Sequence, residues 1–426
     1  MSTSGVNALI DSKLTESQKA ALRLISRVGP LSRSAIARRM PFARSKLSPE
    51  LATLVDLGLL QPAGLSASTG GRKGETLALG SETVAVLAGV DIDIDRVDIA
   101  ITTLDGGIVA QARIDLEAEA DPHETLTRCC QVIRSLRRAS MGPIIAIGVG
   151  IPADLDPITG RITATPTMPN WADVPVEDTF KLEFDAPIFI ANDTKVLALA
   201  ELTARSRAGT GIDSFIVVKI STGIRAGIVI GGEVVDGVRG RAGEVGHICA
   251  DLASGTRCVC GNTGCLESLA SAPALVRAAG ASTRSGASSL LAKALATHGA
   301  ITYQDIGDAS SAGDLEAITI LRDAGTRIGF VLAGVIMILD PSALVVSSGL
   351  SAGSALLLSA IREVVYQRAL PEMTKDLEIT PSLFAQEKRV FGPAILAVEG
   401  LLQSPQLGDR WAPLGQDSDV GAGRRA

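Results

Sequence analysis

The 426-residue sequence has no long apolar run. No stretch reaches the ~18 consecutive apolar residues that a membrane-spanning helix requires. The longest candidate, Ile328 to Leu339, ends at Asp340-Pro341 and is expected to be the buried end of a helix. The first residues, MSTSGVNALID, also lack the cationic and then apolar order of a secretory signal peptide. These absences predict a cytoplasmic protein that does not enter a membrane.

Histidine and cysteine are scarce, with three and six residues, and only one segment contains a complete metal-ligand set. That segment, GEVGHICADLASGTRCVCGNTGCLES, contributes His247, Cys258, Cys260 and Cys265. Three thiolates and one imidazole favour Zn²⁺, and four protein ligands leave no open position for a reactive water. We therefore expect a structural zinc ion, and the alternative is a group of buried thiols. The other cysteines are expected to be packing residues: Cys129, Cys130 and Cys249.

Charge is unevenly distributed along the chain. The net charge is −6, yet residues 1–80 contain eleven Lys/Arg against five Asp/Glu, and the remainder contains 29 against 41. A basic N-terminal part on an acidic body indicates that the N-terminal part meets a polyanion. The alternative is a solvated cationic face with no partner.

The first 80 residues have the pattern of a winged helix-turn-helix. Thr15 and Gln18 form a capping-box pair before a helix whose apolar face holds Ala21, Leu24, Ile25 and Val28. Ser32 is placed to cap a short second helix, and a third helix ending at Gly58 turns Leu47, Leu51, Leu54 and Val55 inward. A hairpin of Leu59–Leu60 and Thr76–Leu79, with its tip at 68–73, would be the wing.

Two groups of residues in this domain are candidates for DNA contact. Side chains at the exposed start of the third helix would reach bases: Arg44, Ser45, Lys46 and Ser48. Arg72 and Lys73 in the wing would reach phosphates or a minor groove. Pro49 leaves two alternatives, because the helix either starts late, capped by Ser48, or is kinked. The domain could also bind protein, but its charge and wing favour DNA.

The remaining sequence alternates strands and helices and predicts an α/β fold. Apolar strands are expected at VAVLAGVDI, IIAIGVGIP, PIFIAND, FIVVKISTG, AGIVIGGEVV and ALVVSSGLSAG, and a helix is expected from about His123 to Ala139. No G-x-G-x-x-G follows the first strand, so the Rossmann type is not favoured. The tail at 403–426, rich in Gly, Asp, Pro and Arg, is expected to be disordered.

The segments GEVGH and CVCGNTGCLES, followed by Glu267, resemble the signature of the ROK family of sugar kinases and sugar-responsive repressors. The N-terminal order RSAIARRM, ARSKLS, hairpin, GGRK also resembles the DNA-binding domain of the ROK repressors. The resemblance implies two actin/hexokinase-like lobes with a cleft between them. Lobe boundaries would be 84–197, completed by a helix near 388–402, and 198–387 with the zinc segment.

A sugar site is implied by the same resemblance. Its residues would be Asn192, Asp193, Glu244, His247 and Glu267, with Asn170 as a weaker candidate. The chemistry suits sugar hydroxyls, which donate and accept hydrogen bonds and therefore need carboxylates and amides held on rigid turns. His247 could use one ring nitrogen for zinc and the other for a hydroxyl, or zinc could only fix its neighbours.

The sequence of the phosphate loop distinguishes the two predicted functions, a regulator and a kinase. ROK kinases carry D-x-G-G-T after the first strand, whereas this chain has Asp93, Ile94 and Asp95 after Asp91-Ile92, and Arg225 stands at a glycine of the second phosphate-facing turn. Side chains block the close approach of phosphates, and the added carboxylates repel them. Asp193 matches the family's catalytic base, here regarded as vestigial.

We therefore expect a non-enzymatic transcriptional regulator of carbohydrate metabolism, a repressor. Its partners would be operator DNA and a sugar or sugar-phosphate effector, and it would be a homodimer or homotetramer because palindromic half-sites favour dimers. The alternative is an ATP-dependent sugar kinase with an accessory DNA-binding domain.

Overall fold

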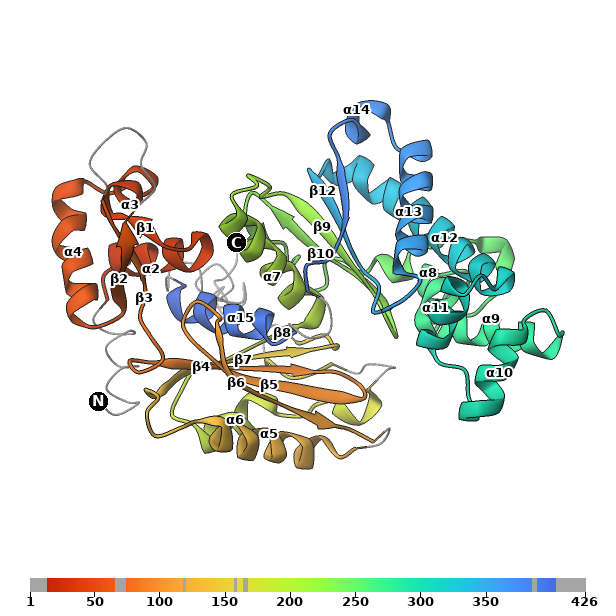
Figure 1. Cartoon of the computed structure of the whole chain (residues 1–426), viewed down its shortest axis with the longest axis horizontal. Coiled ribbons are helices and arrows are strands. Elements are labelled where there is room, and N and C mark those ends of the chain that lie inside the picture. The colour runs from red at the N-terminus through yellow and green to blue at the C-terminus, as the bar shows by residue number, and fades with distance from the viewer. Residues whose placement is uncertain are drawn as a thin grey trace, which may run out of the picture.

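The computed structural model describes residues 14–65, 74–117, 120–156, 159–163, 168–384 and 389–403. Within these ranges the chain forms one small sheet and two five-stranded sheets (Figure 1). The small sheet belongs to an N-terminal unit, residues 14–65 and 74–79, which we call the head. No helix of the described ranges combines the length and the apolar character needed to cross a bilayer.

The head contains three helices and a three-stranded sheet. The helices are α2 (Glu16–Val28), α3 (Arg33–Arg39) and α4 (Arg44–Asp56), and the strands are β1 (Leu31–Ser32), β2 (Leu60–Leu65) and β3 (Glu75–Leu79), in the order β1-β3-β2. The predicted caps are confirmed, because Thr15 and Gln18 form the capping box and Ser32 accepts a hydrogen bond from the amide of Ala35. The short strand β1 was not predicted.

Helix α4 begins at Arg44, so the alternative of a late start at Ser48 is wrong. Pro49 lies inside the helix, where it removes the amide that would have bonded to the carbonyl of Ser45. Ser45 and Pro49 are both exposed, so water can satisfy that carbonyl. After the helix, Gly58 adopts a φ of +74° and its amide donates to Val55, which gives the expected left-handed stop.

The first large sheet has the strand order β6-β5-β4-β7-β8. Its strands are β4 (Val86–Ile92), β5 (Arg96–Thr102), β6 (Ile108–Asp115), β7 (Ile144–Ile151) and β8 (Ile188–Asn192). Helices α5 (Pro122–Leu136) and α6 (Val176–Glu183) cover one face, and α15 (Phe391–Leu402) covers the other (Figure 1). We call this layered unit lobe 1. Strands β4 and β7 are buried along their whole length because both faces are covered.

Helix α15 returns from the C-terminal part of the chain and packs very closely on lobe 1. A Cβ atom at Gly148 of β7 would lie 1.8 Å from the carbonyl oxygen of Pro393, and one at Gly89 of β4 would lie 2.9 Å from that of Val390. Glycine at these two positions therefore sets how closely the helix approaches the sheet.

The second large sheet has the order β11-β10-β9-β12-β13. Its strands are β9 (Phe215–Ile220), β10 (Ile224–Ile230), β11 (Glu233–Val234), β12 (Ala343–Ser347) and β13 (Glu378–Pro381). Helix α7 (Asp193–Ala208) packs on the face that carries Val217 and Val345, while the opposite face carries Ile216 and Leu344. We call this sheet and the helices on that opposite face lobe 2.

The helices of lobe 2 build most of its core. They are α8 (Leu266–Ala270), α9 (Ala272–Arg284), α10 (Ser289–His298), α11 (Tyr303–Ser311), α12 (Leu315–Leu339), α13 (Ser354–Arg368) and the short α14 (Pro371–Thr374). The apolar run 328–339 forms the end of α12, but the prediction that it is buried is wrong in part. Phe330, Met337 and Ile338 are 50, 44 and 81% exposed, because only one side of α12 faces the core.

The head and lobe 1 share one apolar cluster. Leu22 and Ile25 of α2 belong to it together with Leu87 of β4 and with Ala397 and Val398 of α15. The head is therefore packed on lobe 1 and is not held only by the connecting residues 80–83.

Candidate effector site and metal cluster

Asn192 and Asp193 lie where β8 ends and α7 begins. Asn192 is 5% exposed, and its side chain accepts from the amide of Thr194 at 3.0 Å and donates to the carbonyl of Ala153 at 3.2 Å. Asn192 is therefore the N-cap of α7 and also fixes the segment after β7. Asp193, the first residue of the helix, is held in place by this cap.

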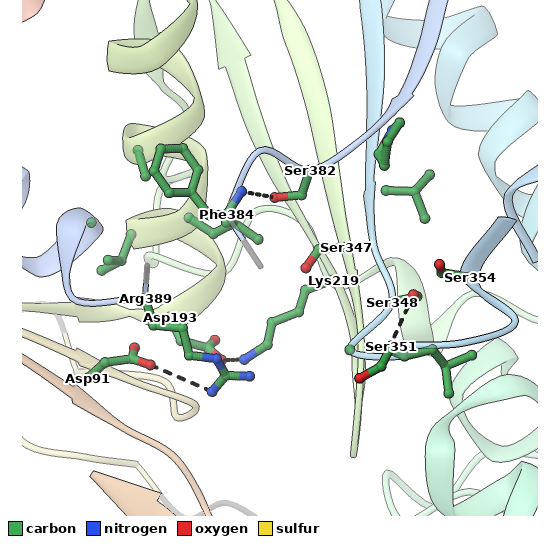
Figure 2. Close-up of a pocket in the computed structure, with 18 of the residues that line it drawn as sticks. Asp91, Asp193, Lys219, Ser347, Ser348, Ser351, Ser354, Ser382, Phe384 and Arg389 are labelled. Atoms are coloured by element: carbon green, nitrogen blue, oxygen red, sulfur yellow. Dashed lines mark hydrogen bonds and ion pairs between the residues drawn. The ribbon is translucent and has the colours of Figure 1, made fainter. Parts of the chain in front are cut away.

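The carboxylate of Asp193 is paired with Lys219 of β9 (Figure 2). Both side chains are largely buried, with 10% and 15% of their surface exposed. Burial disfavours the charged lysine, but the carboxylates of Asp193 and Asp93 outweigh it and raise the pKa of Lys219 above its usual value. The lysine stays charged, so the carboxylate of Asp193, the predicted vestigial base, is held in an ion pair.

A second charged group lies beside this pair. Arg389, which precedes α15, contacts Asp93 and lies 3.6 Å from Asp91 at the end of β4. Burial raises the pKa of Asp91 to about 7. The Asp93 side chain is 18% exposed; its partial burial opposes ionisation, but Lys219 and Arg389 lower its pKa to about 2. Asp95, the third altered loop position, is exposed, with 73% of its side chain accessible.

One side of a cavity of about 800 Å³ between the lobes is lined by four of the charged residues: Asp91, Asp193, Lys219 and Arg389. Figure 2 shows Asp91, Asp193 and Arg389 on the lobe 1 side, with the Lys219 side chain extending toward them. The opposite wall carries serine hydroxyls: Ser347, Ser348, Ser351 and Ser354. The cavity therefore has charged side chains on one side and hydroxyl groups on the other, and apolar side chains such as Leu358 and Phe384 complete its lining.

Glu244 is paired with Arg225, the residue that stands at a glycine of the second phosphate-facing turn in the kinases. Nη2 of Arg225 lies 2.5 Å from Oε1 of Glu244 and 2.5 Å from Oδ1 of Asp154. Asp154 follows β7 of lobe 1, whereas Arg225 belongs to β10 of lobe 2, so the guanidinium bridges the two lobes. Burial raises the pKa of Glu244, and Arg225 opposes that rise.

Glu267 accepts a hydrogen bond from the turn between β9 and β10, directly before Arg225. Its Oε2 accepts a hydrogen bond from the amide of Ile224 at 3.1 Å, and a Cβ atom at Gly223 would lie 2.8 Å from this oxygen. The carboxylate thus fixes the β9–β10 turn from α8. Asn170, the weaker candidate, is exposed in the 3-10 turn η1 (Pro169–Trp171).

The four predicted metal ligands lie together. Their ligand atoms all fall within 4.8 Å of one another: His247, Cys258, Cys260 and Cys265. Sγ of Cys260 lies 3.7 Å from Sγ of Cys265, and Sγ of Cys258 lies 3.6 Å from Nδ1 of His247. Zn–S bonds of ~2.3 Å in a tetrahedron place two sulfurs about 3.8 Å apart. The spacing fits a tetrahedral ion.

His247 connects the cluster to Glu244. Its Nδ1 faces Cys258, and its Nε2 lies 3.9 Å from Oε2 of Glu244. Of the packing cysteines, Cys129 and Cys130 are buried as predicted, but Cys249 is exposed and that prediction is wrong. The strand-like pairing of Cys249 with Cys265 involves the backbone and leaves the Cys249 side chain outside.

The candidate DNA-contact residues of α4 are exposed on one helix. They are Arg44, Ser45, Lys46 and Ser48. Nζ of Lys46 lies 5.2 Å from the centre of the Phe42 ring. Arg72 and Lys73 belong to segment 66–73, which lies outside the described residues. The tail from 404 onward also lies outside them.

Sequence reasoning missed Lys219, Arg389 and Asp154. One signal was available for Lys219, a single lysine within the apolar strand FIVVKI. A charge in a buried strand requires a partner. The identity of that partner depends on the tertiary fold.

The fold and the site define a two-lobed α/β protein of the hexokinase-like type, with a cavity between the lobes that holds charged side chains. The chain belongs to the ROK family, whose family model matches residues 87–399.

Relatives of two kinds match the chain. The xylose repressor of Bacillus spizizenii is 26% identical over 90% of this chain and 95% of its own length. A glucokinase of Halalkalibacterium halodurans is 30% identical over 71% of this chain and 92% of its own length. The crystal structure of a ROK family transcriptional regulator, a homologue of the E. coli MLC protein, aligns with a TM-score of 0.75 and 25% identity over 91% of this chain and 96% of that one.

Proposed function

We propose that this protein is a sugar-responsive, DNA-binding transcriptional regulator that acts as a repressor. The observation that carries the proposal is the head, a three-helix unit with a small sheet that is packed on a ROK fold. The match to the xylose repressor spans 90% of the chain, whereas the match to the glucokinase spans 71%. The difference in span supports a regulator over a kinase.

The head would bind operator DNA through α4 and the wing. Arg44, Ser45, Lys46 and Ser48 are exposed at the start of α4, the end of a recognition helix that enters a major groove. Arg72 and Lys73 would add phosphate or minor-groove contacts. Two heads would be required for a palindromic operator, so the working form would be a homodimer or homotetramer.

The sugar effector would bind near the start of α7, between Asn192, Asp193, Glu244, His247 and Glu267, with Asn170 at the edge. Glu244 and Asp154 share the guanidinium of Arg225 across the cleft. A sugar hydroxyl that bonds to Glu244 would compete with Arg225 and would thereby alter a contact between the lobes. The effector could be a sugar or a sugar phosphate.

Phosphoryl transfer is not proposed. In this chain, side chains replace the glycines of the phosphate loop, and Arg389 pairs with Asp91 and Asp93 beside it. The candidate base Asp193 is paired with Lys219. Phosphoryl transfer depends on holding phosphates and Mg²⁺ in place, and these ion pairs occupy the charged groups that would do so.

The metal site would hold one structural Zn²⁺ on His247, Cys258, Cys260 and Cys265. Four protein ligands leave no position for a reactive water, so the ion would contribute folding energy. Through His247 it would also fix Glu244.

A thermal-shift screen against D-xylose, D-glucose, N-acetyl-D-glucosamine and their phosphate esters tests the sugar site. A binding sugar should raise the melting temperature. Asp193→Asn and Glu244→Gln should weaken binding of that sugar, since loss of a hydrogen bond to a charged group costs about 1–3 kcal/mol, or roughly 5- to 150-fold in affinity. Glu363→Gln, an exposed position on α13, is the matched control. Parent-like shifts in both site variants would place the pocket elsewhere.

A further inference from the structure

Two arginines of α2 reach both lobes. Arg23 and Arg27 are four residues apart and share one face of the helix. Nε of Arg23 lies 2.7 Å from Oε2 of Glu399, and Nε of Arg27 lies 2.6 Å from Oε1 of the same residue, which belongs to α15 on lobe 1. Both guanidinium groups also lie 3.4 Å from the carboxylate of Glu233 in β11 of lobe 2.

The contact with lobe 1 is buried. The Glu399 side chain is only 5% exposed and stands in the apolar helix FGPAILAVEGLL. A buried ion pair stabilises a fold no more than well-packed apolar residues do, but removing one partner leaves an uncompensated buried charge. Glu399 therefore fixes how α2 is oriented on α15, next to the apolar cluster that the head and lobe 1 share. The head is thereby anchored to lobe 1.

The contact with lobe 2 is exposed and polar. The Glu233 side chain is 64% exposed, and Arg27 adds a hydrogen bond of 3.2 Å to the carbonyl of Gly232. Exposed ion pairs of this kind are weak and are exchanged easily for water. This contact can therefore form and break while the buried contact with lobe 1 persists.

The lobe 2 contact lies on the same hairpin as the bridge across the cleft. Strand β11 pairs with the end of β10, where Val229 is opposite Val234. The start of β10 carries Arg225, which contacts Asp154 of lobe 1. Arg225 and Glu233 thus stand on two paired strands of one hairpin, so a change in the contacts of Arg225 would act on the hairpin that also carries Gly232 and Glu233.

We propose that Arg23, Arg27, Glu233 and Glu399 form a joint that transmits the state of the cleft to the head. Lobe 1 carries the head through Glu399, and the contact with Glu233 reports the position of lobe 2. The inference rests on the proposed function, because it requires an effector that moves one lobe relative to the other.

Hydrogen exchange of the ligand-free, full-length protein tests the joint itself. Glu233→Gln should speed exchange of the α2 amides from Arg23 to Val28 by about two- to fivefold, the effect of losing an exposed pair. Glu399→Gln should speed it at least about tenfold, because two arginines lose a buried partner. Glu363→Gln should match the parent. Parent-like exchange in both joint variants would overturn the proposal.

The second arm adds the sugar that gives the largest thermal shift. In the parent, exchange should change both at the cleft, residues 188–196, and in α2. Glu233→Gln should keep the change at the cleft and lose the change in α2, and an α2 response as large as in the parent would overturn the joint. If no sugar protects the cleft, the proposed sugar site fails, and the ligand-free arm still decides the joint.

Discussion

The charged side chains in the cleft form ion pairs with one another. Asp193 is paired with Lys219, Arg389 lies against Asp91 and Asp93, and Arg225 is shared by Glu244 and Asp154. A ligand that uses one of these residues must replace an existing contact. Binding and a change of contacts between the lobes are therefore linked at the level of single residues.

Asp91 should make the protein less stable as the pH rises from about 4 to 7. Burial raises the pKa of its carboxyl to about 7 in the folded chain, whereas the unfolded chain has the usual value of ~3.9. The folded state alone holds a proton in this window, so the contribution is complete below pH ~4 and is lost as the pH rises through about 7.

Urea unfolding at several pH values measures this contribution. Asp91→Asn cannot titrate and should flatten the dependence of the free energy of unfolding on pH in this window. Asp95→Asn, an exposed position of the same loop, should leave it unchanged. A slope in Asp91→Asn as steep as in the parent would rule out this residue as the source.

The metal cluster predicts one zinc per chain. Cys260→Ser should reduce the zinc content measured by mass spectrometry from one equivalent to nearly none and should lower the melting temperature, because metal binding supplies folding energy. Cys249→Ser is the matched control, since Cys249 is exposed and outside the ligand set. Full zinc content in Cys260→Ser, or none in the parent, would contradict the assignment.

Sequence spacing predicted the metal cluster but not the ion pairs. The four ligands fall between His247 and Cys265, so local chain geometry brings them together. Arg389 and Asp93, by contrast, are 296 positions apart and meet only because α15 returns to lobe 1. The pairing of Asp154 with Arg225 likewise follows from how β10 faces the segment after β7. Such contacts depend on tertiary structure, which periodicity does not encode.

Among the helices and strands, the start of α4 and the short strand β1 could not be predicted from the sequence. The helical pattern predicted α4, and its start at Arg44 places the four candidate residues in its first turns. The sequence did not settle this start, because Pro49 is compatible with two boundaries. The two-residue strand β1 lies below the length at which alternation gives a signal.

Lys46→Ala should change which DNA sequences the head prefers. A contact between a side chain and a base edge contributes about 1–3 kcal/mol of discrimination. Binding of the full-length protein to a library of duplexes, read by sequencing, measures the preference. Arg322→Ala on α12 of lobe 2 is the control and should keep the parent's preference. An unchanged preference in Lys46→Ala would remove this residue from the set that reads bases.

Gly148→Ala should disrupt the packing of α15 on β7. The added Cβ would lie 1.8 Å from the Pro393 carbonyl oxygen, so the helix must shift, at a cost of about 1–3 kcal/mol or more. The melting temperature should fall. Gly334→Ala in α12 meets no atom within 4 Å and should leave stability unchanged or raise it by up to ~1 kcal/mol. Equal melting temperatures for the two variants would contradict the close packing of α15.

The whole molecule places a head on one lobe of a two-lobed cleft. Lobe 1 contributes Asp193 and Asp154 to the cleft, lobe 2 contributes Lys219 and Arg225, and the head shares its apolar cluster with lobe 1. A ligand that changes how the lobes meet would therefore change how two heads of an oligomer are spaced. This arrangement suits regulation of DNA binding.

The most direct test is DNA binding with and without sugar. Fluorescence anisotropy would use a duplex selected with the full-length protein, and a fragment that begins at Val84 would serve as the control without the head. We predict that one sugar of the panel weakens binding by at least about tenfold, a coupling within the usual 1–3 kcal/mol, and that the fragment does not bind. DNA binding unaffected by every sugar, together with ATP-dependent phosphorylation at ~1–100 s⁻¹, would contradict the account.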